Sequence, residues 1–180
     1  MSDSVRLWCL RHAESDNVVN GVAGAVPLAQ LTPAGRAQAV AAGVTLAAEP
    51  IAKVYTSTAL RARQTGQLLG STEVRTMPGL VEVGIGAAEG STDPAIRQRT
   101  ADVLHTWVVL GDLDEQVADG ETGHDVLARM TTAFDTLAAT HAGETVAVVG
   151  HVASLTVVLA LLCGLGAVSG VRRCGMPSRS

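Results

Sequence analysis

Four side chains able to hold an anion stand where a predicted strand gives way to a helix. They are Arg11, His12, Arg61 and His151. If these junctions meet at one edge of a sheet, two guanidiniums and two imidazoles share one cleft, and such a cluster repels itself unless an anion occupies it. Phosphate is the best candidate, because each guanidinium can donate two parallel hydrogen bonds to it and stays charged at any relevant pH.

The elements that would bring these residues together alternate along the chain. Apolar runs predict strands at 5–10, 53–56, 73–77 and 144–150. Helical periodicity and capping residues predict helices at 33–49, 58–69, 94–110, 122–140 and 152–165. This alternation predicts an α/β fold, a three-layer sandwich with a mostly parallel sheet flanked by helices. Ligands in such sheets bind beyond the carboxyl ends of the strands, where the four side chains fall.

Local signals predict helix starts and faces. Thr32 is the expected N-cap of the first helix, and Ser57 or Thr58 is the expected cap of the second. Apolar residues recur with helical period in the first helix at Ala37, Val40, Ala41, Val44 and Ala48. In the helix at 122–140 one apolar face is formed by Val126, Met130, Phe134 and Leu137. Three histidines without matched partners are expected to be solvated: His105, His124 and His141.

Length and composition bound the class of protein. With 180 residues, 47% of them hydrophobic, the chain fits a single domain over residues 1–180. The net charge is −4 and the 13 lysines and arginines are scattered, which argues against a nucleic-acid partner. Three widely spaced cysteines indicate neither a disulfide framework nor a zinc site and favour the cytoplasm. No signal peptide is expected, and the apolar stretch 152–165 is shorter than the roughly 20 residues that a membrane helix requires, so no membrane partner is expected.

Six blocks of sequence occur in the order found in one enzyme family. They are "LRHAESDN", "VPLAQLTPAGRAQA", "YTSTALRARQT", "LVEVGIGAAEG", "GETGHDVLAR" and "VAVVGH". The set resembles the histidine phosphatase superfamily, in the branch related to cofactor-dependent phosphoglycerate mutase. The Arg-His pair alone is weak evidence of kinship, but the ordered set covers about residues 5–151 and is strong. The resemblance implies a phosphoglycerate mutase-like fold.

The resemblance also implies a role for each matched residue. His12 would be the nucleophile that receives the phosphoryl group as a phosphohistidine. The residues that would hold the phosphoryl oxygens are Arg11, Asn17, Arg61 and His151. Glu82 takes the position of the general acid, and a phosphate anion beside it would favour the protonated form that can donate to a leaving alkoxide. Glu89, the other glutamate of that loop, is interpreted as structural. Neither a metal nor another cofactor is expected.

Several positions depart from the family pattern. Ala13 and Val152 each replace a glycine that commonly follows an active-site histidine, and Ala88 stands where the family usually has tryptophan. The chain ends at Ser180, whereas relatives typically continue through a further strand and tail. A missing C-terminal strand and tail is therefore one interpretation of the end of the chain.

The expected function is metal-independent hydrolysis of a small phosphate monoester through phosphorylated His12. The segment 90–120 is short, whereas mutases of the family carry longer insertions, so hydrolysis is favoured over phosphoglycerate mutase-type phosphotransfer. The changes at Ala13, Ala88 and Val152 leave a third alternative, a binding or regulatory protein that keeps the phosphate pocket without turnover. The partner implied is a small phosphorylated substrate. No readable pattern identifies that substrate or the oligomeric state, for which a homodimer is one option.

Overall fold

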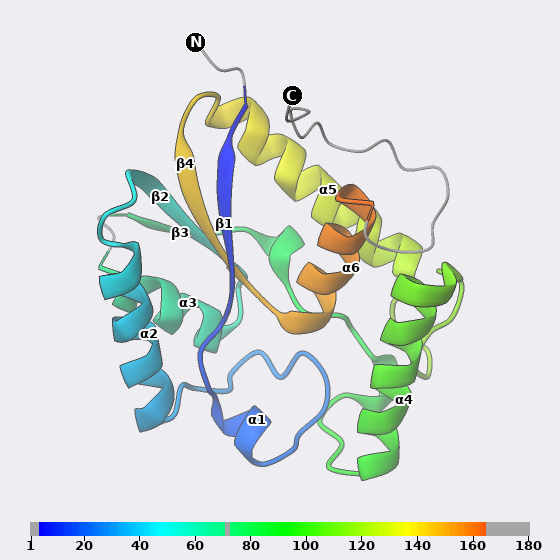
Figure 1. Cartoon of the computed structure of the whole chain (residues 1–180). Coiled ribbons are helices and arrows are strands. Elements are labelled where there is room, and N and C mark those ends of the chain that lie inside the picture. The colour runs from blue at the N-terminus through cyan, green and yellow to red at the C-terminus, as the bar shows by residue number, and fades with distance from the viewer. Residues whose placement is uncertain (1–3, 71–72, 165–180) are drawn as a thin grey trace.

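A four-stranded sheet between two layers of helices forms the protein, as the computed structural model describes it for residues 4–70 and 73–164 (Figure 1). The strands are β1 (Arg6–Arg11), β2 (Ile51–Thr56), β3 (Val74–Thr76) and β4 (Thr145–Gly150). They lie in the spatial order β1-β4-β2-β3, and all pairings between them are parallel. The α/β fold with a parallel sheet, predicted from the alternation of strands and helices, is confirmed.

The helices cover both faces of this sheet (Figure 1). One face carries α2 (Pro33–Leu46) and α3 (Leu60–Leu68), and the other carries α5 (Gly123–Thr140) and α6 (Val152–Leu162). The short α1 (Asp16–Val19) lies below the carboxyl ends of the strands, and α4 (Pro94–His105) stands apart from the sheet on the α6 side. The predicted helix at 94–110 is α-helical only to His105, after which one π-helical turn leads to Gly111 at φ 75°.

The central strand β4 contributes side chains to both cores. All six of its residues are buried, and successive side chains of a strand point to opposite faces. Ala147 and Val149 pack with the residues beneath α2 and α3, whereas Val148 packs with those beneath α5 and α6. A continuous apolar run is what a strand covered on both faces requires.

The predicted N-cap at Thr32 is confirmed, and the one predicted at Ser57 or Thr58 is wrong. The hydroxyl of Thr32 accepts from Gly35 N at 2.9 Å, and a capping box formed with Asp125 begins α5. The helix α3, however, begins at Leu60 with no side-chain cap, because its N-cap position is Ala59. The predicted cap at Ser57 or Thr58 fails because Ser57 still pairs with β4, its N donating to Val149 O, and the helix begins only after Ala59.

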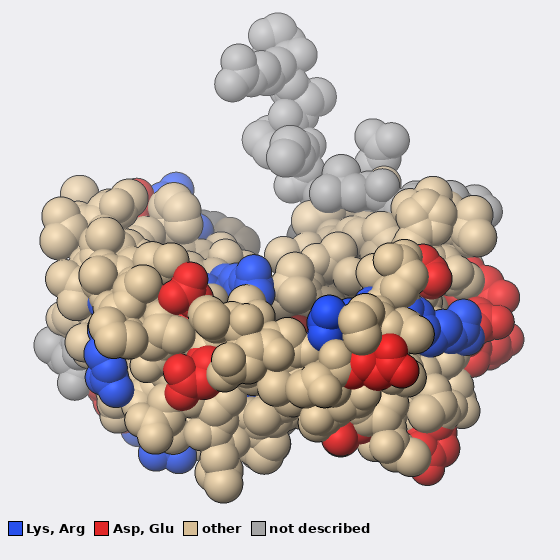
Figure 2. All heavy atoms as spheres, turned by 90° about the horizontal axis from the view of Figure 1, so that it is seen from below, with Lys and Arg blue, Asp and Glu red and all other residues tan. Residues whose placement is uncertain are grey.

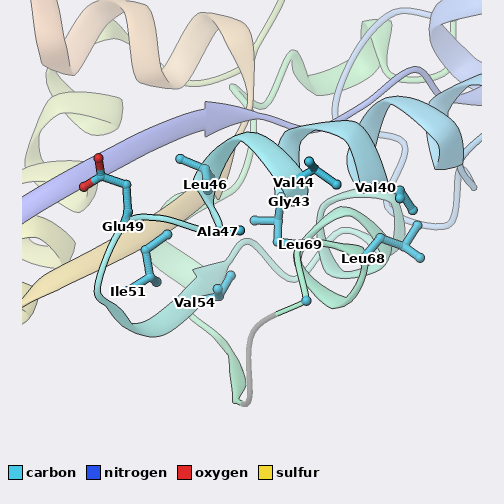
Figure 3. A pocket seen from close by; sticks show the side chains of 11 residues that line it. Val40, Gly43, Val44, Leu46, Ala47, Glu49, Ile51, Val54, Leu68 and Leu69 are labelled. Atoms are coloured by element: carbon cyan, nitrogen blue, oxygen red, sulfur yellow. The ribbon is translucent and has the colours of Figure 1, made fainter.

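The periodic apolar residues of α2 face solvent. Val40 is 49% exposed and Val44 is 73% exposed, whereas the buried residues of this helix are Gly35, Ala39 and Leu46. Gly43 explains the orientation, because a Cβ there would lie 2.7 Å from the carbonyl oxygen of Leu69 at the end of α3. The close contact with α3 turns the Val40–Val44 side outward. An open apolar groove of about 500 Å³ results between the two helices (Figure 3).

His141 is buried, contrary to the prediction that it is solvated. It is 6% exposed at the end of α5. Its Nε2 lies 2.8 Å from the Tyr55 hydroxyl and its Nδ1 lies 2.6 Å from a carboxylate oxygen of Glu144. The tight turn from α5 into β4 places it under the sheet. His105 and His124 are exposed, as predicted.

No helix within residues 4–70 and 73–164 has both the length and the apolar composition that crossing a membrane demands. The interpretation of a missing C-terminal strand concerns residues beyond 164, which lie outside the described part of the chain.

Candidate active site at the carboxyl ends of the strands

Three polar side chains follow directly on three neighbouring strands. The β1–β4 ladder continues one residue further, where His12 N donates to Gly150 O at 2.9 Å. On the other side of β4, Ser57 N donates to Val149 O at 3.1 Å. Because His151 follows Gly150, the side chains of His12, His151 and Ser57 start from the same edge of the sheet. This is the edge at which a parallel sheet binds ligands.

Arg61, in the first turn of α3, joins the two histidines. Its Nε donates to His12 Nε2 at 3.1 Å and its Nη2 donates to His151 Nδ1 at 3.2 Å. Its Nη1 donates to the carbonyl of Val26 at 2.8 Å, from the loop that precedes α2. Arg61 is 1% exposed, and the two imidazole centroids are 5.1 Å apart. Burial lowers the pKa of the guanidinium, although the negative charge of Glu82 acts in the opposite direction.

These contacts fix the tautomer of both rings. His12 Nδ1 lies 2.7 Å from the carbonyl oxygen of Ala13, and because a carbonyl can only accept, Nδ1 carries the proton. The lone pair of His12 is therefore on Nε2. A guanidinium can only donate, so His151 Nδ1 carries a lone pair and its Nε2 carries the proton. That proton is directed to Ser57 Oγ, 2.7 Å away.

Both imidazoles are neutral at neutral pH. Burial, followed by the charges of Arg61 and Arg11, lowers the pKa of His12 from 6.5 to about 4, although the hydrogen bond to Ala13 acts in the opposite direction. Burial, followed by the charge of Arg61, lowers the pKa of His151 to about 2. The self-repulsion expected for four cations is thus avoided by two neutral rings. The guanidiniums supply the positive charge.

Glu82 lies against the first turn of α6. Its Oε1 accepts from Val83 N and from Ser154 N, both at 3.0 Å, and its Oε2 accepts from Ala153 N at 3.3 Å. These oxygens satisfy N–H groups of the first helical turn, which have no partner within the helix. Since Ala153 and Ser154 follow His151 by two and three residues, the Glu82 carboxyl group adjoins the histidine cluster.

Arg11 adjoins the cluster, and Asn17 follows His12 by five residues along the chain. Arg11 is exposed at the end of β1, and its charge contributes to the lowered pKa of His12 and His151. Asn17 is 8% exposed in α1, and its Oδ1 accepts from Ser15 Oγ at 2.8 Å, which leaves its amide nitrogen as a donor. The structure thus brings His12, Arg61 and His151 into direct contact and places Arg11 and Glu82 next to them, whereas the side chain of Asn17 contacts Ser15.

Glu89 connects the loop below the cluster to the loop that carries Glu82. Its Oε2 accepts from Ala25 N at 2.7 Å and its Oε1 accepts from Ile85 N at 2.9 Å. Gly24 has φ 91°, and a Cβ there would lie 2.0 Å from the Glu89 carboxylate. These contacts support the structural interpretation of Glu89.

Two hollows adjoin the cluster. One, of about 440 Å³, is lined by residues that include Arg11, His12 and Gln38. The other, of about 260 Å³, is lined by Glu82, by Arg97 and Thr100 of α4 and by apolar residues. Figure 2 views the molecule from the side of the carboxyl ends of the strands, and basic side chains stand on both sides of the hollowed middle of that face. The α2–α3 groove of Figure 3 contains none of the cluster's residues and is no candidate for phosphate.

Two participants escaped the sequence analysis. The sequence predicts Ser57 as a helix cap, but its place directly after a strand, like that of His12 and His151, also indicates a side chain at the ligand-binding edge of the sheet. The carbonyl of Val26 has no sequence signal at all, because any residue supplies one. In residues 4–70 and 73–164 no group of three or more His, Cys, Asp or Glu side chains is arranged to hold a metal ion.

A neutral imidazole lone pair beside a buried guanidinium, both at the strand ends of a parallel sheet, suits a phosphoryl group, because the guanidinium can hold its oxygens and the imidazole can attack phosphorus. The sequence matches the histidine phosphatase superfamily, branch 1, over residues 7–177. The chain belongs to this superfamily, as its ordered blocks indicated, and its structural neighbours are phosphoglycerate mutase-like histidine phosphatases.

Solved structures agree with this assignment. YhfR of Bacillus stearothermophilus is 30% identical with a TM-score of 0.77, over 89% of this chain and 81% of that one. A putative α-ribazole-5'-phosphate phosphatase from Escherichia coli is 25% identical with a TM-score of 0.72, over 89% and 80% of the two chains. A mycobacterial glucosyl-3-phosphoglycerate phosphatase is 28% identical with a TM-score of 0.71, over 87% and 81%. No curated protein matches the sequence.

Proposed function

We propose that this protein is a phosphatase that hydrolyses a small phosphate monoester through a phosphorylated His12. The observation that carries the proposal is the state of His12: its Nδ1 proton is held by the Ala13 carbonyl, and the lone pair on Nε2 faces Arg61 at 3.1 Å. With its pKa lowered to about 4 by burial, the ring is a neutral nucleophile at pH 7. The solved neighbours named as phosphatases favour hydrolysis over phosphotransfer to a second hydroxyl.

In the first step the phosphoryl oxygens take over hydrogen bonds that Arg61 now gives to His12 and His151. This frees the lone pair on His12 Nε2 for in-line attack. The Nε2–P bond forms, the ester P–O bond breaks, and the leaving alkoxide takes a proton from the Glu82 carboxyl group. Arg11 and the amide nitrogen of Asn17 add further donors to the phosphoryl oxygens, whose charge must be stabilised in the transition state.

In the second step a water molecule attacks the phosphorus of phosphorylated His12. Glu82, now a carboxylate, accepts the proton of that water, the N–P bond breaks, and phosphate leaves with the imidazole regenerated. One carboxyl group serves both steps because donating a proton in the first prepares it to accept one in the second. Its place beside the first turn of α6, adjoining His151, suits both tasks.

The hollow of about 260 Å³ beside Glu82 is proposed to receive the leaving group. Val83, Ile85 and Leu104 give it apolar walls, and Arg97 provides a cation at its lining. A compact leaving group with an apolar part fits this composition. The acid that protonates the leaving oxygen would then line the pocket that holds the rest of the alcohol.

The experiment is a phosphate-release assay on the full chain with p-nitrophenyl phosphate and a panel of small phosphate monoesters, with a chelator present. Wild type should release inorganic phosphate, and His12→Ala should not. An alkaline quench with a radiolabelled substrate should trap a phosphorylated chain in wild type only. His124→Ala is the matched control, because His124 is exposed on α5. Equal turnover by His12→Ala, an isomerised product without phosphate, or binding without turnover would each overturn the proposal.

A further inference from the structure

The loop that carries Glu82 depends on α5 for its backbone hydrogen bonds. Residues 79–84 form no strand or α-helix, so their carbonyl groups need donors from elsewhere. Arg129 supplies them from α5: its Nη1 donates to Gly79 O at 2.9 Å and to Val81 O at 2.8 Å. Its Nη2 donates to the carbonyl of Glu82 itself at 3.2 Å.

Glu121 fixes the guanidinium that makes these contacts. Arg129 Nε lies 2.7 Å from Glu121 Oε1, and Arg129 Nη2 lies 2.9 Å from Oε2. With the three carbonyl contacts, all five N–H donors of the guanidinium are used. Glu121 Oε2 also accepts from Gly84 N at 2.8 Å, so this ion pair holds the loop at both ends. The side chains are 19% and 27% exposed, so water competes little for these bonds.

The loop lies directly on α5 and on the residues before it. A Cβ on Gly120 would lie 2.2 Å from Gly84 O, and a Cβ on Gly79 would lie 3.0 Å from Arg129 O. The backbone on both sides of Glu82 is therefore in close contact with α5 and the residues before it. Its carboxyl group is held separately, by the first turn of α6.

We infer that Arg129, fixed by Glu121, is a positioning residue that sets where the general acid Glu82 stands relative to the leaving oxygen. The inference rests on the proposed function, because it requires that Glu82 donates the proton. A planar fork is needed, since one group must reach three carbonyls and a carboxylate together, and the ammonium of lysine has only three donors. A displacement of about 1 Å in a reacting group can cost about 10²-fold in rate.

The test compares a substrate whose leaving group must be protonated by a general acid with one whose leaving group need not be. An alkyl phosphate leaves as a strongly basic alkoxide, whereas p-nitrophenolate is stable without a proton. The quantity measured is kcat/KM, which covers steps up to phosphoryl transfer to His12 and excludes hydrolysis of the phosphohistidine. Arg129→Met should lower kcat/KM for an alkyl phosphate by about 10- to 100-fold and for p-nitrophenyl phosphate by less than about threefold. Glu82→Gln, the reference, should show the same selectivity.

Further variants separate positioning from loss of folding. Glu121→Gln keeps Arg129 but removes the carboxylate that fixes it, and it should lower kcat/KM with the same selectivity for the alkyl phosphate. Arg129→Lys should recover little of the alkyl phosphate activity. The control is Arg99→Met, which removes another Arg–Glu ion pair, with Glu115, and should leave kcat/KM for both substrates unchanged.

The outcomes distinguish the inference from the function on which it rests. Suppose that Glu82→Gln lowers kcat/KM for the alkyl phosphate only, but Arg129→Met and Glu121→Gln lower it equally for both substrates or for neither. The ion pair is then purely structural, and the positioning inference fails while the proposed function stands. If Glu82→Gln itself shows no dependence on the leaving group, the proposed acid is wrong, and the positioning role falls with it.

Discussion

Ser57 and Ser154 form a natural pair for testing which hydrogen bonds hold the candidate active site. Both are serines with 0% exposure. Ser57 Oγ lies 2.7 Å from His151 Nε2 and accepts from Ala59 N at 3.2 Å. The hydroxyl of Ser154, by contrast, is the one buried side-chain polar atom without a hydrogen-bond partner among residues 4–70 and 73–164. Replacing each serine by alanine removes a hydroxyl group from an equally buried position. The replacement should destabilise the fold at Ser57, whose hydroxyl has partners, but not at Ser154, whose hydroxyl has none.

The magnitude follows from what each deletion leaves behind. Ser57→Ala leaves the Nε2 proton of His151, itself 0% exposed, without an acceptor. An unsatisfied buried donor costs about 1–3 kcal/mol, and the loss of Ala59's partner places the expectation at about 2–3 kcal/mol. For a chain of this size that corresponds to roughly 5–10 °C in Tm. Ser154→Ala removes a hydroxyl whose burial is uncompensated, so the free energy of unfolding should stay level or rise by up to about 1 kcal/mol.

Urea unfolding at pH 7.5, where both active-site imidazoles are neutral, measures this difference. The two variants should share the m-value of wild type, so that the midpoint alone reports the change in stability. The reasoning is refuted if both variants are destabilised alike. It is also refuted if Ser57→Ala unfolds at the wild-type midpoint, since His151 would then not depend on the serine for its tautomer.

Three further predictions follow from the site. Burial lowers the pKa of His12 to about 4 and that of His151 to about 2, whereas histidine in the unfolded chain has a pKa near 6.5. Below pH 6.5 the unfolded chain therefore binds more protons than the folded one. The free energy of unfolding should be at its full value above pH 6.5 and fall toward pH 4 by about 1.4 kcal/mol per pH unit for each ring. A urea midpoint no lower at pH 5 than at pH 7.5 would contradict this. Gly24→Ala should cost about 1–3 kcal/mol by calorimetry, because φ is 91° and the Cβ would meet the Glu89 carboxylate; an unchanged Tm would count against it. Arg61→Lys should lower kcat/KM by at least about 10²-fold, since an ammonium cannot contact His12, His151 and a phosphoryl group from fixed fork positions, and wild-type turnover would disprove the assignment.

The sheet was predictable because its signals are local and strong. The strand β4 reads as an uninterrupted apolar run, and the cap at Thr32 and the apolar face of α5 lie where the pattern predicts. For the same reason the sequence correctly predicted that His12 and His151, which directly follow β1 and β4, lie at one edge of the sheet. Parallel strands carry their last residues to one edge, whatever the loops do.

The failures occurred where a long-range contact decides the outcome. The exposed Val44 follows from the close approach of Gly43 to α3, which no period within α2 can show. The burial of His141 depends on Tyr55, 86 residues away in the chain. Ser57 had the right residue type for a cap, but the strand next to it and the imidazole of His151 determined its role.

Arg61 gives the proposed mechanism an internal order of events. Its three nitrogens already have partners, and one of these partners is the lone pair that must attack phosphorus. While this arrangement lasts, the lone pair of the proposed nucleophile is occupied by a hydrogen bond from Arg61. A phosphoryl group that enters the cluster draws the guanidinium to its own oxygens, because charge-assisted bonds to an anion are stronger than bonds to a neutral imidazole. In the proposed mechanism, the movement that binds the substrate would also release His12 Nε2, so that binding and activation of the nucleophile would be a single step.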